Sequence, residues 1–439
     1  MASESKGIAL SFYSRALRLM VLIAGVAVTL GSKSAAVVVP LLALATAANA
    51  YYQQVPSQFT FYREPPFVLW AAFAALAAVS AIWSLSPAAS VTSGANLLLL
   101  LVSLVALHCV WPILPAETSR LIGTSLGIGF AIGAVFVLAD VSTGGAIVVQ
   151  LLALIDGTVR SSATLLVREN DVIVGALQAF SNWNVAGTTI LFWPILLLVS
   201  AVAAERWRTP AMLACVALVA ALTFASFHET SKLAFVVGSA IFLLARVARR
   251  AALVLLTTGF VLAVALILPI TKLAHDTLRL HHASWVPDTV QARFVIWNYT
   301  ADQVSGAPIL GIGANATKSW KAPEGQLVSS DGHFFSPTVS SHSHNFFVQV
   351  WFELGFIGAL LFGLAGASTL AAIARARASV QPYAIATAAA SLVICSATWS
   401  MWHIWLASNI GLASAILALG GAIVDETRPP DRQRHRCRL

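Results

Sequence analysis

Apolar runs close to the length that spans a bilayer recur along the whole chain. An α-helix needs about 20 consecutive apolar residues to cross the hydrocarbon core, and there the backbone polar groups are satisfied only inside helices or closed barrels. Of the 439 residues, 58% are hydrophobic and 10% charged, and the mean hydropathy is +0.83. We therefore predict an all-α polytopic membrane protein with a helical bundle.

The apolar pattern predicts twelve spans. They are centred on residues 17–31, 35–50, 67–84, 95–114, 121–139, 185–204, 210–227, 233–248, 251–270, 346–372, 382–400 and 406–424. The stretch ATAANA before Tyr51 looks like a signal-peptidase site. The run ahead of it is broken at GSKSA and is too long for one signal segment, so we expect it to stay uncleaved.

Lysine and arginine set the predicted orientation, because cytoplasmic loops carry an excess of both. An inside N-terminus places 17 of the 26 in the cytoplasm. The short loops ERWR, RVARR and RARAR all fall on that side, and both termini are then cytoplasmic. The net charge of +8 thus reflects topology and requires no nucleic-acid partner. The basic tail RPPDRQRHRCRL is a stop-transfer flank or a contact for anionic lipid.

The four cysteines predict neither a disulfide framework nor a zinc site, because no CxxC or Cys/His ligand spacing occurs. The sequence also lacks a P-loop, a GxGxxG after a strand, and an internal repeat of 20–50 residues. Any chemistry must therefore draw its energy from the substrate. We expect no cofactor and no metal, since the outer acidic residues include no Asp-x-Asp and no dense oxygen cluster.

Two outer segments are too polar to span the membrane, residues 141–184 and 271–344. A connection as long as the second usually carries function. Within it, PDTVQARFVIWNYTADQVSGAP predicts an amphipathic helix with Asp288 as N-cap and Gln291 completing a capping-box-like pair. Arg293 and Trp297 share one face of that helix, and the simpler interpretation is an arginine stacked on a tryptophan.

These segments divide the chain into four parts. We expect an N-terminal bundle of about nine spans (1–270), an outer loop domain (271–344), C-terminal transmembrane helices (345–424) and a basic cytoplasmic tail (425–439).

The stretch SSHSHNFFVQVWFELGFIGALLF places polar residues at the edge of the tenth span. His344 and Asn345 lie at the water–lipid boundary, and an interfacial histidine with an asparagine N-cap is the simpler interpretation. Gly355 and Gly358 are small enough to permit close helix approach. Glu353 is harder to explain structurally, because acids inside a membrane are usually functional or partnered.

Four collinear segments resemble the superfamily of O-antigen ligases and of O-antigen or exopolysaccharide polymerases. They are AFSNWNVAGTTILFWPILLL, with the Asn-x-Asn-x-x-Ala pattern at Asn182 and Asn184; SFHETSKLAFVVG; ARFVIWNYTADQVSGAPILGIGANA, with Arg-x-x-x-Trp followed by Pro-x-x-Gly-x-Gly; and His-Asn, nine residues, Gly-x-x-Gly from His344 to Gly358. Together they cover about residues 178–365.

The resemblance implies an inverting, metal-independent glycosyltransferase of the integral-membrane GT-C type in the bacterial inner membrane, with its active site facing the periplasm. It implies an undecaprenyl-diphosphate-linked glycan as donor and a glycan or lipid A core sugar as acceptor. The catalytic histidine matches His344 and the diphosphate-binding arginine matches Arg293. A second basic residue matches Lys232, where typical ligases have arginine and exopolysaccharide polymerase relatives more often have Ser-Lys.

The residue types suit this chemistry. An imidazole with a pKa near 6.5 can take a proton from a sugar hydroxyl at neutral pH. A departing diphosphate needs fixed cations if no metal is present, and Arg293 and Lys232 supply them.

Further substrate contacts are expected from the residues around these three. They are Asn345, Trp297, Asn182, Asn184, Glu353 and His342.

Several alternatives remain open. Lys232 follows Glu229 by three residues and would form a local ion pair; His342 would replace His344 as the base; Asn182 and Asn184 would cap the sixth span. We expect His228, His281, His282 and His333 to be solvated loop residues, and His403, in SMWHIW, to belong to an interfacial aromatic belt.

The alternative functions are a flippase or transporter of lipid-linked glycans and a structural subunit. Ligase and polymerase differ only in the acceptor, which the sequence does not record.

Overall fold

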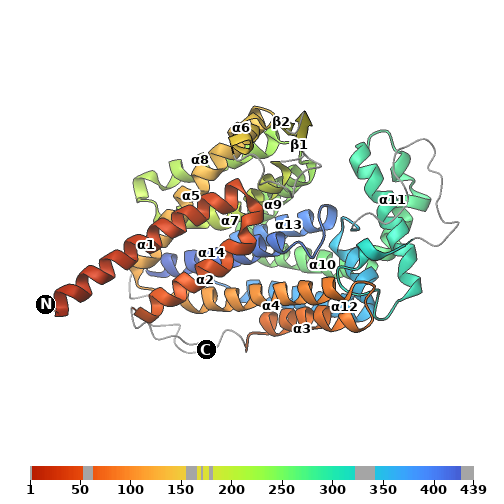
Figure 1. Cartoon of the computed structure of the whole chain (residues 1–439), viewed down its shortest axis with the longest axis horizontal. Helices are drawn as coiled ribbons and strands as arrows, with labels where there is room; N and C mark the ends of the chain where they lie inside the picture. The colour runs from red at the N-terminus through yellow and green to blue at the C-terminus, as the bar shows by residue number, and fades with distance from the viewer. Residues whose placement is uncertain are drawn as a thin grey trace.

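The computed structural model describes residues 2–52, 63–154, 166–169, 172–176, 181–321 and 342–426 (Figure 1). The basic tail with Cys437, and His333, lie outside these residues. The described helices are α1 (Ala2–Leu30), α2 (Ala35–Tyr52), α3 (Pro65–Val79), α4 (Pro87–Val110), α5 (Ala116–Ser142), α6 (Ala146–Leu154), α7 (Asn182–Val202), α8 (Glu205–Ala225), α9 (Glu229–Val247), α10 (Arg249–Lys272), α11 (Asp288–Gln303), α12 (Phe346–Arg375), α13 (Gln381–Ala397) and α14 (Ile404–Glu426).

Each of the twelve predicted spans falls on one of these helices, namely α1 to α5, α7 to α10 and α12 to α14. Ten helices in the described part of the chain are long and apolar enough to cross a membrane. The apolar helix α13 is shorter, Gln381–Ala397. The prediction of an all-α polytopic membrane protein is therefore confirmed. The outer segment 141–184 also contains an antiparallel hairpin of β1 (Leu166–Glu169) and β2 (Val172–Ala176), which we did not predict.

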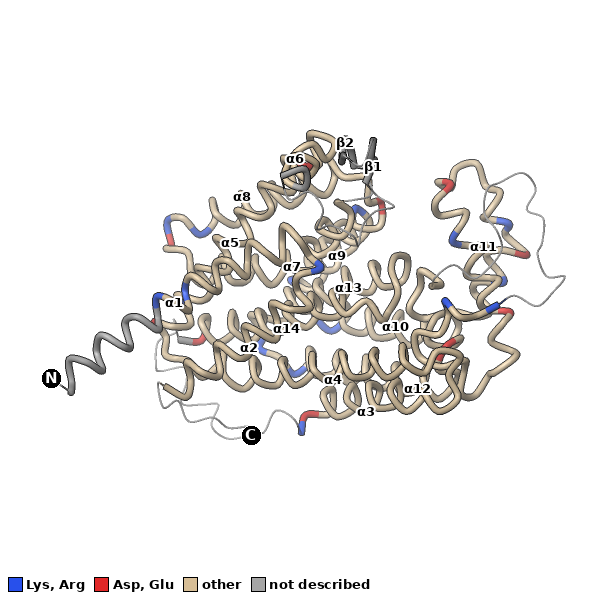
Figure 2. Tube along the Cα trace, in the orientation of Figure 1, with Lys and Arg blue, Asp and Glu red and all other residues tan. Residues whose placement is uncertain are grey.

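The bundle is built around α7 and closely packed small residues. In the most apolar 18-residue stretch of each helix, 83% of the residues are buried in α7 and 17% in α8. Between α1 and α5, a Cβ added at Gly129 would lie 2.4 Å from the carbonyl oxygen of Leu22, so only glycine permits this approach. Small residues allow such contacts in membranes, where apolar burial alone does not drive helices together. Figure 2 shows few charged residues along the helices.

The predicted helix in the second outer segment is present as α11, which stands beyond the end of the bundle near α10 and α12 (Figure 1). The predicted cap is wrong: Pro287 holds the N-cap position, and Asp288 is the first helical residue. Gln291 does not complete a capping box. Its amide donates to the carbonyls of Ala283 and Val286 at 3.1 and 2.8 Å, because the preceding loop folds back over the helix start.

Helix α12 is broken at Gly355, which has φ 60° and ψ −158°. At the break, some backbone N–H and C=O groups of α12 have no hydrogen-bond partner within the helix. Residues 308–313 provide the missing partners. Phe356 N donates to Pro308 O at 2.8 Å, and Gly313 N donates to Glu353 O at 2.8 Å. Two of the sequence motifs, Pro-x-x-Gly-x-Gly and Gly-x-x-Gly, are thus one interlocked structure.

Glycine is required on both sides of this junction. A Cβ on Gly355 would lie 2.4 Å from the carbonyl carbon of Ile309, and one on Gly311 would lie 2.3 Å from that of Glu353. At Gly358 glycine is needed for another reason: a Cβ there would lie 2.1 Å from the Cβ of Leu354. Close approach to another helix was predicted for both glycines, but the neighbour of Gly355 is a loop, and the nearest atoms to Gly358 belong to Leu354 of α12 itself.

We predict that Gly355→Ala lowers the free energy of unfolding by about 1–3 kcal/mol or more, because the new Cβ meets backbone and φ is positive. Thermal unfolding of the purified protein in detergent measures this. Gly127→Ala in α5 is the matched control, since a Cβ there meets nothing within 4 Å. Equal melting temperatures for Gly355→Ala and Gly127→Ala would contradict the interlocked junction.

Candidate active site

His344 is held in a single backbone and ring orientation at the start of α12. Its φ of 55° lies in the left-handed region. The next residue, Asn345, is the N-cap of α12, and its side chain accepts from the amides of Phe347 and Val348 at 2.9 and 3.2 Å. The N-cap interpretation of Asn345 is therefore confirmed. This cap fixes the backbone directly after His344, where the chain enters α12.

The ring of His344 is fixed by a hydrogen bond between its Nδ1 and the backbone carbonyl of Thr398. A carbonyl only accepts, so Nδ1 must carry the proton. Nε2 is then the acceptor nitrogen of the neutral ring, which is the form that a general base requires.

The charge of Arg293 on α11 acts on His344, which lies just before α12. Burial is the main cause that lowers the pKa of His344 below 6.5, and the charge of Arg293 lowers it further; the bond to Thr398 opposes both. A lowered pKa keeps the imidazole neutral at neutral pH. On the same helix as Arg293, Trp297 packs edge-to-face on Phe294, with ring centroids 5.4 Å apart.

His228 belongs to this region, which corrects its prediction as a solvated loop residue. Its side chain is only 5% exposed because it packs against Trp399, with ring centroids 5.1 Å apart. Its Nδ1 lies 2.6 Å from Ser231 Oγ. Burial, followed by the charge of Arg293, lowers its pKa to about 3. The charge of Arg293 thus acts on the histidine at the start of α9 as well as on His344.

Lys232 lies in the first turn of α9, and its Nζ is 2.8 Å from Glu229 Oε1. The local ion pair that competes with a catalytic role is therefore present. Lys232 is 25% exposed and Glu229 57% exposed, so the lysine is the more buried partner. An exposed pair of this kind contributes little to stability.

His342 and His403 lie beside His344. The ring of His342 is 4.0 Å from that of His344 and 5.6 Å from that of His403, measured between centroids. The prediction of an interfacial aromatic belt around His403 is wrong, because the neighbouring Trp402 and Trp405 are 8% and 6% exposed and face the protein interior. Hydropathy alone does not distinguish these two environments.

Glu353 holds this region together. It is fully buried, at 0% exposure. Its oxygens accept from the amides of Asn315 and Thr317 at 2.9 and 3.2 Å and from Gln349 Nε2 at 3.2 Å. The hydroxyl of Thr317 and the indole of Trp402 also donate to it. The carboxylate is thus occupied by protein donors from three segments, which makes Glu353 a positioning residue in this structure.

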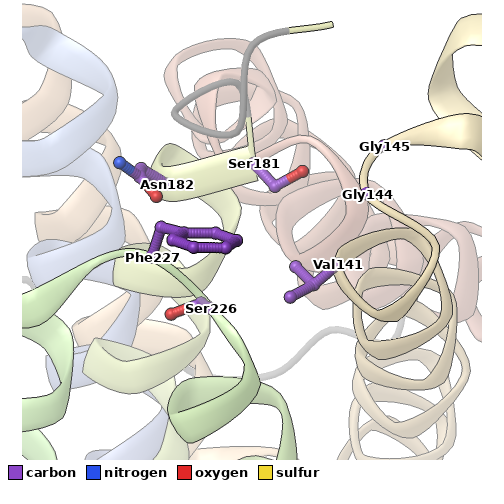
Figure 3. A pocket seen from close by; sticks show the side chains of 7 residues that line it. All are labelled: Val141, Gly144, Gly145, Ser181, Asn182, Ser226 and Phe227. Atoms are coloured by element: carbon purple, nitrogen blue, oxygen red, sulfur yellow. The ribbon is translucent and has the colours of Figure 1, made fainter.

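The two predicted asparagines of α7 lie in different surroundings, and neither side chain caps the helix, whose N-cap is Ser181. Asn184 Oδ1 accepts from the amide of Ser32 at 3.0 Å and so holds the turn between α1 and α2. Asn182 lines a small pocket at the C-terminal ends of α5 and α8 and the N-terminal end of α7 (Figure 3). The other lining residues are Val141, Gly144, Gly145, Ser181, Ser226 and Phe227.

We predict that Glu353→Gln destabilises the protein, because the amide NH₂ would face groups that donate to the carboxylate. Each buried donor left unpaired costs about 1–3 kcal/mol, measured by thermal unfolding in detergent. Glu229→Gln, at a 57% exposed position, is the matched control and should change stability by only a few tenths of a kcal/mol. A Glu353→Gln protein as stable as the control would refute the positioning role.

Part of the chain is similar in sequence to known proteins. Residues 213–363 match the family model described as O-antigen ligase. Proteins named "Putative polysaccharide ligase" are 29% identical over 133 residues in Rickettsia felis and 30% identical over 129 residues in Rickettsia typhi. A third, from Rickettsia conorii, is 36% identical over 70 residues.

These matches cover 30%, 29% and 16% of this chain, respectively. The chain spans 32%, 31% and 17% of the length of the same relatives, about a third or less of each. The matched region 213–363 is similar to the O-antigen ligase family, and it holds Lys232, Arg293, His344 and three of the four sequence motifs.

Proposed function

We propose that this protein is a membrane glycosyltransferase that moves a glycan from undecaprenyl diphosphate to the hydroxyl of an acceptor glycan. The observation that carries the proposal is the orientation of the His344 ring, whose Nδ1 is bonded to the Thr398 carbonyl. The charge of Arg293 acts on this ring. The fold, the O-antigen ligase match and the names of the relatives support the same class of enzyme.

The proposed transfer needs one base and fixed cations. The acceptor hydroxyl oxygen attacks the anomeric carbon from the side opposite the diphosphate, and the bond between that carbon and the diphosphate oxygen breaks with inversion. The hydroxyl proton goes to His344 Nε2, and the bonding electrons leave with the lipid diphosphate. Arg293 can grip two diphosphate oxygens through its planar guanidinium, and Lys232 supplies a compact charge. No metal is required to neutralise the leaving group.

The charge pattern supports an orientation with both termini in the cytoplasm and residues 271–344 in the periplasm. Under this proposal the reaction occurs at the periplasmic face of the bacterial inner membrane. Figure 2 places charged residues of both signs around α11, in contrast with the mostly uncharged helices of the bundle. The acceptor is a lipid A core sugar for a ligase and another lipid-linked repeat unit for a polymerase.

We predict that His344→Ala abolishes glycan transfer while the protein stays folded and inserted, because the acceptor hydroxyl loses its proposed base and the residue lies outside α12. Product formation from purified lipid-linked donor and acceptor measures this. His282→Ala, an exposed histidine of the same outer segment, is the matched control and should keep wild-type turnover. Near wild-type product from His344→Ala would remove it as the base. A donor that moves across the bilayer with its glycosyl bond intact would instead indicate a flippase.

We predict that Lys232→Gln slows transfer by about 100-fold, the scale of losing one donor to a developing oxyanion. Lys232→Arg should keep measurable activity because the charge is retained. Rates are measured at saturating donor. Lys272→Gln is the matched control, since Lys272 Nζ also lies 2.8 Å from an acidic oxygen, in this case of Asp302. If Lys232→Gln reacted as fast as wild type, Lys232 would be only the partner of Glu229.

A further inference from the structure

The carbonyl of Thr398 decides which nitrogen of His344 carries the proton, so the groups that hold this carbonyl matter for the proposed base. Thr398 is the C-cap of α13, and its φ of −128° and ψ of −103° take the chain out of the helical path. Its hydroxyl still donates to the carbonyl of Ile394 in α13. Its own carbonyl instead accepts from His344 Nδ1. The direction of that carbonyl is therefore not set by the α13 helix.

Trp399 shares a rigid peptide unit with this carbonyl. A peptide unit is planar, so the Thr398 carbonyl and the Trp399 N–H turn together. The half-buried indole of Trp399 contacts two other rings. It lies 5.1 Å from the ring of His228 and 4.9 Å from that of Trp405, measured between centroids. Holding this side chain restricts the rotation of the peptide unit and thus of the carbonyl.

The ring of His228 is itself held in place. His228 is the N-cap residue of α9, and its side chain is 5% exposed. Its Nδ1 lies 2.6 Å from Ser231 Oγ, and its backbone N–H donates to Ser226 Oγ at 3.3 Å. Its backbone carbonyl accepts from the amides of Ser231 and Lys232 at 2.9 and 3.2 Å. His228 therefore offers Trp399 a ring of restricted orientation.

Helix α12 holds the same loop at a different place. Gln349 donates to Ser400 Oγ at 2.9 Å and accepts from the amide of Met401 at 3.1 Å. These bonds act one and two residues beyond Trp399. The contact between His228 and Trp399 thus lies nearer to the Thr398 carbonyl than the bonds from α12 do.

We propose that His228 is a positioning residue for the proposed base. Its ring holds Trp399 and, through the peptide unit that joins Trp399 to Thr398, the carbonyl that orients His344. This inference rests on the proposed function, because that function makes His344 the base. The backbone carbonyl of His228 also begins the turn that carries Lys232, so one residue connects the base with a proposed cation.

The kinetic test compares variants that remove or keep the ring. His228→Ala should lower kcat by about 100-fold, the loss that a misplacement of about 1 Å can cause, while KM for the donor stays unchanged. His228→Phe keeps a flat ring against Trp399 and should restore kcat to near the wild-type value. Wild-type kcat in His228→Ala, or equal losses in His228→Ala and His228→Phe, overturn the proposal.

The matched control is His108→Ala. His108 also packs on an aromatic ring, that of Phe67, with centroids 5.8 Å apart. It lies on α4, so its loss tests the general effect of removing a histidine from an aromatic contact. This variant should keep the wild-type kcat. A loss as large as that of His228→Ala would show a general effect and overturn the positioning role.

The same contact is also tested from its other side. If His228 acts through Trp399, the double variant His228→Ala/Trp399→Ala should be no slower than Trp399→Ala, because both changes break one contact. Losses that multiply in the double variant contradict the proposal. Ser231→Ala is the milder test if His228→Ala does not fold, since it removes only the bond that fixes the ring. It should lower kcat, and a wild-type value overturns the proposal.

The tautomer of His344 separates this inference from the proposed function. Nitrogen NMR of the purified protein with ¹⁵N-labelled histidine, without substrate and near neutral pH, reports which ring nitrogen is protonated. The His344 signals are those absent from His344→Ala. Wild type and His228→Phe should be protonated at Nδ1, and His228→Ala should show both tautomers, because the hydrogen bond that selects one is displaced. This result without detectable transfer refutes the transferase and keeps the positioning role. An unchanged tautomer in His228→Ala refutes the positioning role alone.

Discussion

The buried carboxylate of Glu353 is the interaction on which the rest of the outer region depends. It lies inside α12 at 0% exposure and gathers donors from the 315–317 turn, from Gln349 one turn earlier and from Trp402 before α14. Burying a carboxylate is costly unless it is hydrogen-bonded. Each segment that donates to it is therefore held in place, and the loop that holds Trp402 also holds Thr398, whose carbonyl is bonded to His344.

The break in α12 works together with this carboxylate. Residues 308–313 enter the break at Gly355 and satisfy its open backbone groups, and Glu353 then fixes the next residues of the same loop. On the other side, Gln349 donates to Ser400 at 2.9 Å and accepts from Met401 N at 3.1 Å. This holds the loop whose Thr398 carbonyl orients His344. The N-terminal half of α12 and the loops bonded to it thus fix the position of the His344 ring.

The sequence predicted the helices well, because apolar length is a local property of the chain. It did not predict the broken helix, since Gly355 fits helix packing equally well on spacing alone. The burial of His228 and the connection of Ser32 to α14 were also missed. Both depend on contacts between segments far apart in the chain, such as Asn409 with Ser32. Hydropathy also gave no reason to place Trp402 and Trp405 inside the protein.

The central claim is that this framework keeps His344 neutral, with Nε2 available as the base, beside a fixed positive charge. Burial and Arg293 both lower the pKa of His344, so its neutral form should persist below the usual pKa of about 6.5 for histidine. The most direct measurement is the pH dependence of single-turnover transfer at saturating donor. The account predicts a rate that falls only as the pH drops through a value below 6.5. An acidic limb centred at or above 6.5 would contradict it.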